Sequence, residues 1–90
     1  MALQLDVITP ERRLLSEQVD SVNVPGAGGE LGILPGHTPL LGQLADPGTV
    51  RITTDGGERA YTVNGGFVSV SDEGVSILAE TAEPADAQAH

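Results

Sequence analysis

Residues 68–77 read Val-Ser-Val-Ser-Asp-Glu-Gly-Val-Ser-Ile, and this stretch decides the fold class of the chain. Apolar residues alternate with serine on both sides of an Asp-Glu-Gly segment. Alternation with a period of two is the pattern of a half-buried strand, and a short polar segment with glycine between two such runs is typical of a hairpin. We expect the turn at Glu73-Gly74, which places Val70 opposite Ile77.

The same period of two recurs outside this hairpin. It appears at Leu3–Val7, Val22–Val24, Val50–Ile52 and Tyr61–Val63. No window keeps a period of 3.6 residues for three helical turns, and twelve glycines and six prolines punctuate the chain. Several short strands separated by turn residues predict an all-β fold, either a sandwich or a barrel.

A second hairpin is predicted around Asp55-Gly56-Gly57-Glu58. The two-residue turns that suit hairpins need positive φ angles, which glycine adopts without strain. We therefore expect Gly56 and Gly57 to form the turn. This register places Ile52 opposite Tyr61, an apolar pair across the two strands.

Length and charge exclude several classes of protein. Ninety residues make one small domain, and no run of apolar residues approaches the length of about 20 that a membrane span needs. The chain has four arginines and no lysine against thirteen acids, a net charge of −9. This charge opposes binding to nucleic acid and to anionic lipid. The lack of lysine excludes a Walker-type phosphate loop and a Schiff-base enzyme.

The segment from Gly26 to Pro39 is unusually rich in glycine and proline: Gly-Ala-Gly-Gly-Glu-Leu-Gly-Ile-Leu-Pro-Gly-His-Thr-Pro. Leu31 stands where a dinucleotide-binding loop would need its third glycine, and the prolines prevent a following helix. Two interpretations remain. The segment is either a shaped, semi-rigid surface loop with a function or an ordinary connection between strands.

No residue pattern indicates catalysis or metal binding. His37 is the only histidine inside the chain, and no cysteine or second histidine lies near it to complete a metal site. The chain has no Gly-x-Ser-x-Gly segment, and its acids are scattered. We expect His37 to be a structural or contact residue, and we expect no cofactor or metal. The spacing of the acids leaves paired-carboxylate hydrolysis open, because the fold could bring any two of them together, but the sequence gives it no support.

The proline-rich segment carries a resemblance to a known family. Residues 29–41, Gly-Glu-Leu-Gly-Ile-Leu-Pro-Gly-His-Thr-Pro-Leu-Leu, resemble the hallmark of the epsilon subunit of bacterial F-type ATP synthase, which is similar to the mitochondrial delta subunit. Three further segments resemble the same family in the same order: Leu5–Glu11, Asn64–Val70 and Val75–Glu83. The resemblance covers nearly the whole chain, from about Leu3 to Glu83.

The resemblance implies a flattened antiparallel β-sandwich over residues 1–83. It also implies a non-catalytic subunit of the central stalk, present in one copy in a hetero-oligomeric complex. Such a subunit binds the gamma subunit and the c-ring, and it helps to couple proton-driven rotation to ATP synthesis. The implied location is peripheral, on the cytoplasmic face of the bacterial inner membrane, without direct binding to lipid.

Family contacts carry over where the residues match. The contact with the c-ring is expected at the loop residues Gly28, Gly29 and Glu30. The contact with the gamma subunit is expected at Thr9, His37, Leu41 and Gly42.

The end of the chain departs from the family pattern. Most members continue into two C-terminal helices, which can inhibit ATP hydrolysis and in some members bind ATP. Here Pro84 stands where an arginine is common, and the Ile/Leu-Asp-x-x-Arg-Ala signature is absent. We expect a short form without these helices, and therefore no ATP binding or helix-mediated inhibition. The segment from Glu80 onward lacks large apolar residues, so we expect it to be frayed, with a disordered tail over residues 84–90.

The main alternative is a small β-sandwich module that binds carbohydrate. Such modules usually present aromatic platforms, and the only aromatic residues here are Tyr61 and Phe67. Both lie at strand positions that we expect to be buried. A cupin-type metalloenzyme is a third candidate, and the histidine cluster that it needs is missing from the sequence.

Overall fold

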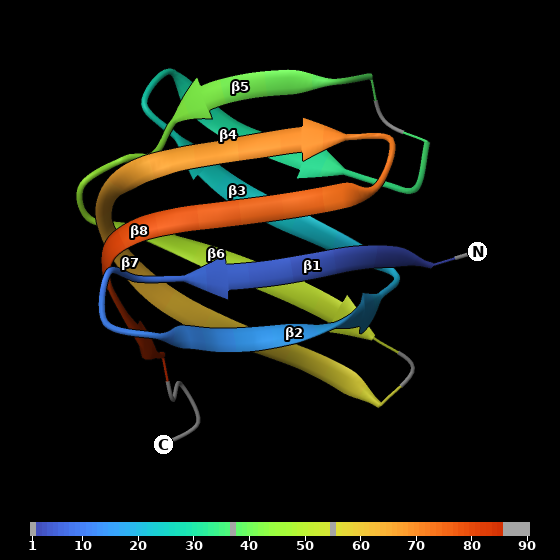
Figure 1. The fold of residues 1–90 in the computed structure, drawn as a ribbon, viewed down its shortest axis with the longest axis horizontal. Helices are drawn as coiled ribbons and strands as arrows, with labels where there is room; N and C mark the ends of the chain where they lie inside the picture. The colour runs from blue at the N-terminus through green and yellow to red at the C-terminus, as the bar shows by residue number, and fades with distance from the viewer. Residues whose placement is uncertain (1, 37, 55, 86–90) are drawn as a thin grey trace.

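The computed structural model describes residues 2–36, 38–54 and 56–85, and these residues form eight β-strands (Figure 1). The strands are β1 (Leu3–Ile8), β2 (Arg13–Val19), β3 (Ser21–Gly26), β4 (Gly29–Ile33), β5 (Leu40–Gln43), β6 (Gly48–Thr54), β7 (Gly57–Ser71) and β8 (Gly74–Pro84). The all-β prediction is confirmed. Among the described residues, no helix is long and apolar enough to cross a membrane.

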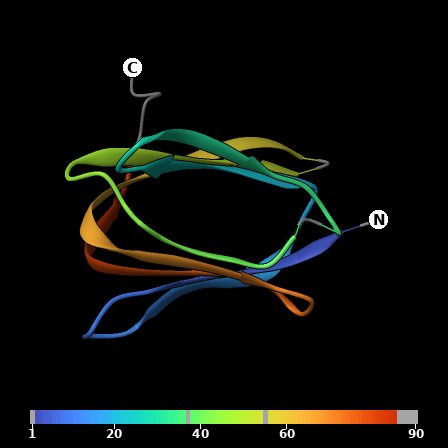
Figure 2. The ribbon, with the colours of Figure 1, turned by 90° about the horizontal axis from the view of Figure 1, so that it is seen from above.

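The strands pair in the order β2-β1-β8-β7-β6-β3-β4, and β5 pairs with β7 beside this path. Figure 2 shows that the sheet folds over into two layers, one containing β1, β2 and β8 and the other containing β3, β4 and β6. Among the described strands, β1 runs parallel to β8, and the other pairings are antiparallel. The expected antiparallel β-sandwich is confirmed, and the parallel pair joins the first and last strands.

The hydrophobic core lies between the two layers, and the alternating residues fill it as predicted. Leu5, Val7, Val24, Val50, Ile52, Val63 and Ile77 are fully buried. Burial of one such side chain contributes about 1.5–3 kcal/mol relative to exposure. The expected alternation therefore provides most of the apolar area that stabilises this small domain.

The long strand β7 belongs to both layers, and it bends at Gly65-Gly66. Its first half pairs with β6 and its second half pairs with β5. Gly66 has a φ angle of 110°, and a Cβ atom there would lie 2.8 Å from the Cα atom of Ala79. A side chain other than hydrogen does not fit at this position. The bend also changes which alternate residues face the core, from Val63 before it to Val68 after it.

Both predicted hairpin registers are wrong. Val70 lies opposite Val75 instead of Ile77, and Ile52 lies opposite Arg59 instead of Tyr61. The reason is the place of Gly57 and Gly74, which follow the turns instead of forming them.

Gly57 and Gly74 have φ angles of 127° and 143°, and each is the first paired residue after a two-residue loop. The loop residue Asp55 lies outside the described residues. A Cβ atom on Gly74 would lie 2.9 Å from the Cβ atom of Gln4. Glycine is thus required at the first paired residue after the loop. Each turn therefore begins one residue earlier than predicted.

The register with Ile52 opposite Arg59 places a charged residue at the edge of the sandwich. There the Arg59 guanidinium forms an ion pair with the Glu17 carboxylate of β2, in the other layer. The backbone amide of Asp20 donates to the Thr53 carbonyl across the same edge, at 2.8 Å. The opposite layer thus provides a polar partner for Arg59, while Ile52 is fully buried in the core.

Strand β8 extends further than the sequence suggests. Residues 81–84 pair with β7, and Pro84 lies opposite Tyr61. The amide of Ala85 donates to the Ala60 carbonyl at 2.8 Å. The expectation of fraying from Glu80 onward is therefore wrong through Pro84. Residues 86–90 of the expected tail lie outside the described residues, so their disorder stays a prediction.

Candidate functional site

Large apolar side chains lie on the outer surface of one layer. Leu41, Phe67 and Leu78 are 71%, 50% and 43% exposed. The expectation that Phe67 is buried is wrong. Its neighbour Val68 faces the core, and because successive strand residues point to opposite faces, Phe67 faces solvent. The period-two alternation that predicts the strands also predicts this exposure, because it assigns Phe67 and Leu78 to the outer face.

Phe67 and Leu78 belong to a row that crosses five strands. Arg13 of β2 lies opposite Ile8 of β1, which lies beside Leu78 of β8. Leu78 lies opposite Phe67 of β7, which lies opposite Gln43 of β5. Neighbouring strands are about 4.8 Å apart, so the row spans about 19 Å. Its middle is apolar and its two ends are polar, which is the organisation of a protein–protein contact.

Leu41 extends this surface along β5. It lies opposite Ser69, two residues along β7 from Phe67, so the two apolar side chains are diagonal neighbours on the outer face. We call Ile8, Leu41, Phe67 and Leu78 the outer apolar patch. An exposed apolar cluster on a small acidic domain is a candidate surface for binding another molecule.

The outer apolar patch contains a shallow hollow of about 330 Å³. It is lined by Ile8, Thr9, Pro10, Gly66, Phe67, Leu78, Ala79 and Glu80. Gly66 and Ala79 have small side chains, and this leaves room between the larger ones. The hollow is thus formed where β7 bends and where β1 ends.

The predicted gamma-contact residue Thr9 borders this hollow, and it also closes the turn between β1 and β2. Its backbone amide donates to the Arg12 carbonyl at 2.9 Å, and its hydroxyl donates to the same carbonyl at 3.2 Å. Thr9 is buried, so its main role is to hold the end of β1. The structure brings it close to Ile8, Phe67 and Leu78, which the sequence argument did not predict as contacts.

Leu41 and Gly42, also predicted gamma contacts, are neighbours in β5 with opposite orientations. Leu41 points outward, whereas a Cβ atom on Gly42 would point inward and lie 3.6 Å from the Val68 Cγ1 atom. That distance is an ordinary van der Waals contact, so a small side chain fits at position 42. His37, the fourth predicted contact, lies outside the described residues.

The predicted c-ring contact lies at the tip of the β3–β4 hairpin. Gly28, Gly29 and Glu30 are all exposed, and Cβ atoms on the two glycines would meet nothing within 4 Å. Glu30 lies opposite Pro25, which fixes the backbone beside it. The amide of Ala27 donates to the Gln43 carbonyl at 2.9 Å, so the hairpin is attached to β5.

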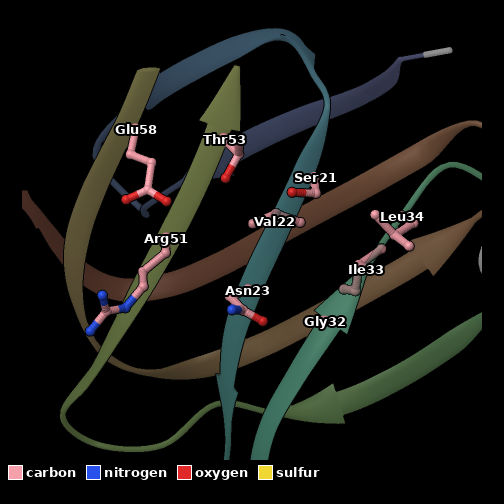
Figure 3. Close-up of a pocket in the computed structure, with 9 residues that line it drawn as sticks. All are labelled: Ser21, Val22, Asn23, Gly32, Ile33, Leu34, Arg51, Thr53 and Glu58. Carbon is pink, nitrogen blue, oxygen red and sulfur yellow. The ribbon is translucent and has the colours of Figure 1, made fainter. Parts of the chain in front are cut away.

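A second hollow, of about 320 Å³, lies on the outer face of the other layer (Figure 3). Polar side chains of β3 and β6 border it, including Asn23, Arg51 and Thr53, together with Leu34 after β4. Among the residues that the structure describes, no group of three or more histidine or acidic side chains could hold a metal ion. The outer apolar patch is the stronger candidate, because it combines exposed apolar area with a hollow.

Comparison with known proteins shows which family this chain resembles. The family described as "ATP synthase, Delta/Epsilon chain, beta-sandwich domain" matches residues 2–85. An ATP synthase epsilon chain of Frankia casuarinae is 49% identical over 83 residues, which cover 92% of this chain and 98% of that one. An epsilon chain of Solibacter usitatus is 50% identical over 84 residues, 93% of this chain and 62% of that one.

Solved structures agree with the sequence relatives. One chain of the Euglena gracilis mitochondrial ATP synthase, in a structure of its OSCP, F1 and c-ring, superposes with a TM-score of 0.85 at 31% identity. The match covers 92% of this chain and 53% of that one. A chain from the central stalk and c-ring of the Tetrahymena thermophila enzyme has the same fold, with a TM-score of 0.75 at 19% identity. These matches do not favour the carbohydrate-binding alternative, and the chain belongs to the family of ATP synthase delta/epsilon β-sandwich domains.

Proposed function

We propose that this chain is a non-catalytic subunit in the central stalk of a rotary ATP synthase, where it binds the gamma subunit and the c-ring. Relatives named ATP synthase epsilon chain at 49% and 50% identity support this role. The observation that carries it is the outer apolar patch, because a domain of this family with such a surface needs a protein partner to cover it.

The outer apolar patch is the proposed contact with the gamma subunit. Phe67 and Leu78 form its centre, and the predicted contacts Thr9 and Leu41 lie at its borders. A stable protein contact buries about 1,000 Å² or more in total, and large side chains near its centre contribute most of the affinity. Of the other two predicted contacts, Gly42 lies in β5, and His37 precedes β5 in the sequence.

The tip of the β3–β4 hairpin is the proposed contact with the c-ring. Gly28 and Gly29 lack side chains, so the backbone of a partner loop can approach closely. The Glu30 carboxylate can accept a hydrogen bond or pair with a basic side chain. One exposed pair of this kind contributes only about 0–1 kcal/mol, so we expect the hairpin to set the position of the contact more than its strength.

The two proposed contacts are joined through Gln43. Its carbonyl accepts a hydrogen bond from Ala27 in the β3–β4 hairpin, and Gln43 lies opposite Phe67 in the sheet. The amide of the next residue, Leu44, donates to the Gly66 carbonyl at 2.9 Å. Paired backbone therefore connects the hairpin to the outer apolar patch. A direct backbone connection of this kind suits a subunit that couples rotation of the ring to the catalytic head.

The proposed location is peripheral, on the cytoplasmic face of the bacterial inner membrane, with one copy in each complex. The net charge of −9 disfavours direct attachment to anionic lipid. Protein contacts would therefore hold the subunit at the membrane.

Size-exclusion chromatography of this chain with the gamma subunit of the same organism tests the proposal. With about 20 µM of each protein, we expect a one-to-one complex, because a dissociation constant in the micromolar range or below keeps most of the chain bound. Elution of two separate proteins at this concentration would contradict the proposed function.

A further inference from the structure

Glu80 lies at the border of the hollow in the outer apolar patch. It follows Leu78 by two residues in β8, and it is among the residues that line the same hollow as Phe67. Its carboxyl group lies over Gly65, where a Cβ atom would be 3.5 Å from the Glu80 Oε1 atom. Within residues 2–36, 38–54 and 56–85, no hydrogen bond or ion pair engages the Glu80 carboxylate. Glu17, by contrast, is paired with Arg59.

Apolar side chains and one carboxylate lie close together around Glu80. Phe67, Leu78 and Ile8 provide the apolar side of the hollow, and the carboxylate lies over Gly65, the chain neighbour of the lining residue Gly66. A purely apolar group that filled this hollow would take water away from the carboxylate and leave it unpaired, which is costly. The occupant that satisfies both sides has an apolar stem and a positive end.

We propose that the hollow receives a lysine or arginine side chain of the docked partner, with its alkyl stem on Phe67 and Leu78 and its cation at Glu80. Long basic side chains bury their stems on apolar surface while the charge stays at the border. A cation within about 6 Å of an aromatic ring is also attracted to the ring face. This inference rests on the proposed function, which supplies the partner. It assigns Glu80 as the residue that pairs with a positive side chain of that partner.

The net charge of −9 strengthens the case for a basic partner surface. An acidic protein attracts basic partners at a distance and raises the rate of encounter. That long-range attraction depends on total charge, whereas pairing inside the hollow depends on the place of one carboxylate. A test must therefore change the charge at Glu80 and, separately, the same charge elsewhere.

Binding of the gamma subunit to the Glu80→Lys variant tests the inference, with Glu73→Lys as the matched control. Both variants change the net charge by the same amount, and exposed Glu73 lies in the turn before β8. We expect the dissociation constant to rise about 10-fold or more for Glu80→Lys and less than about 3-fold for Glu73→Lys. Glu80→Gln should show an intermediate loss and a weaker dependence of affinity on salt.

Equal effects of Glu80→Lys and Glu73→Lys would overturn the inference. Failure of the unchanged chain to bind the gamma subunit would instead overturn the proposed function, so the two failures are distinguishable. A thermal melt of each variant shows whether it is folded. If Glu80→Lys unfolds the chain, Glu80→Gln decides, because it keeps the size of the side chain and removes only its charge.

Discussion

Phe67 lies directly opposite Leu78 on the outer face of the β7–β8 pair, and the two side chains are 50% and 43% exposed. Their chain neighbours Val68 and Ile77 form the adjacent pair and are buried in the core. One hairpin thus carries a core pair on its inner face and an exposed apolar pair on its outer face. Water contacts the outer pair in the free chain, which favours its burial by a partner.

Replacement of Phe67 by alanine should weaken binding of the gamma subunit without unfolding the chain. The side chain is half exposed, so its loss should change the free energy of unfolding by less than about 1 kcal/mol. A central aromatic residue of an interface contributes about 2 kcal/mol or more, which corresponds to about a 30-fold rise in the dissociation constant. Isothermal titration calorimetry measures this change, and Leu34→Ala on the other layer is the control. Unchanged affinity would exclude Phe67 from the contact.

Replacement of Gly66 by alanine should unfold or strongly destabilise the domain. The added Cβ atom would overlap the Leu78 carbonyl, and the φ angle of 110° is strained for any other residue. We expect a loss of about 3 kcal/mol or more in urea unfolding, a large part of the stability of so small a domain. Gly28→Ala is the matched control, because a Cβ atom there meets nothing within 4 Å. A native-like midpoint for Gly66→Ala would show that β7 does not need this bend.

Replacement of Glu30 by alanine should reduce docking to the c-ring while the melting temperature changes by less than about 2 °C. Glu30 is exposed at the hairpin tip, so the core is untouched. Co-sedimentation with reconstituted c-rings and differential scanning calorimetry measure the two quantities. Unfolding of the variant would instead give Glu30 a structural role.

The ion pair between Arg59 and Glu17 should contribute little to stability at physiological salt. The side chains are 46% and 35% exposed, and water therefore screens their attraction. A double-mutant cycle with Arg59→Ala and Glu17→Ala should give a coupling of about 0.2–1 kcal/mol that falls as salt increases. A coupling that stays above about 2 kcal/mol in high salt would contradict this view of the sandwich edge.

Replacement of Ile52 by alanine should cost about 2–5 kcal/mol, because it leaves a cavity between the two layers where the side chain is fully buried. Leu41→Ala removes a side chain of similar size from the surface and should cost less than about 1 kcal/mol. Chemical denaturation of both variants measures the difference. Equal losses would contradict the assignment of the core.

The two hairpins show why register was the weakest part of the sequence argument. Alternation assigns a face to each residue, and it correctly buried Val50, Ile52, Val68 and Val70. It does not state where a turn begins, because shifts of the partner by two residues keep every apolar side chain on its face. The contact between Gly74 and Gln4 of β1, distant in the sequence, fixes one of these registers.

The sequence by itself determined the all-β class, the residues of the core and the family. Local alternation predicts the strands and their buried side chains, and the short motifs indicate the family. Only the tertiary structure decided which outward residues lie together. The outer apolar patch joins β1, β5, β7 and β8, and the bend at Gly66 forms its hollow beside Glu80. Pairing between distant strands depends on the packing of the whole sandwich, so no local sequence pattern predicts this pairing.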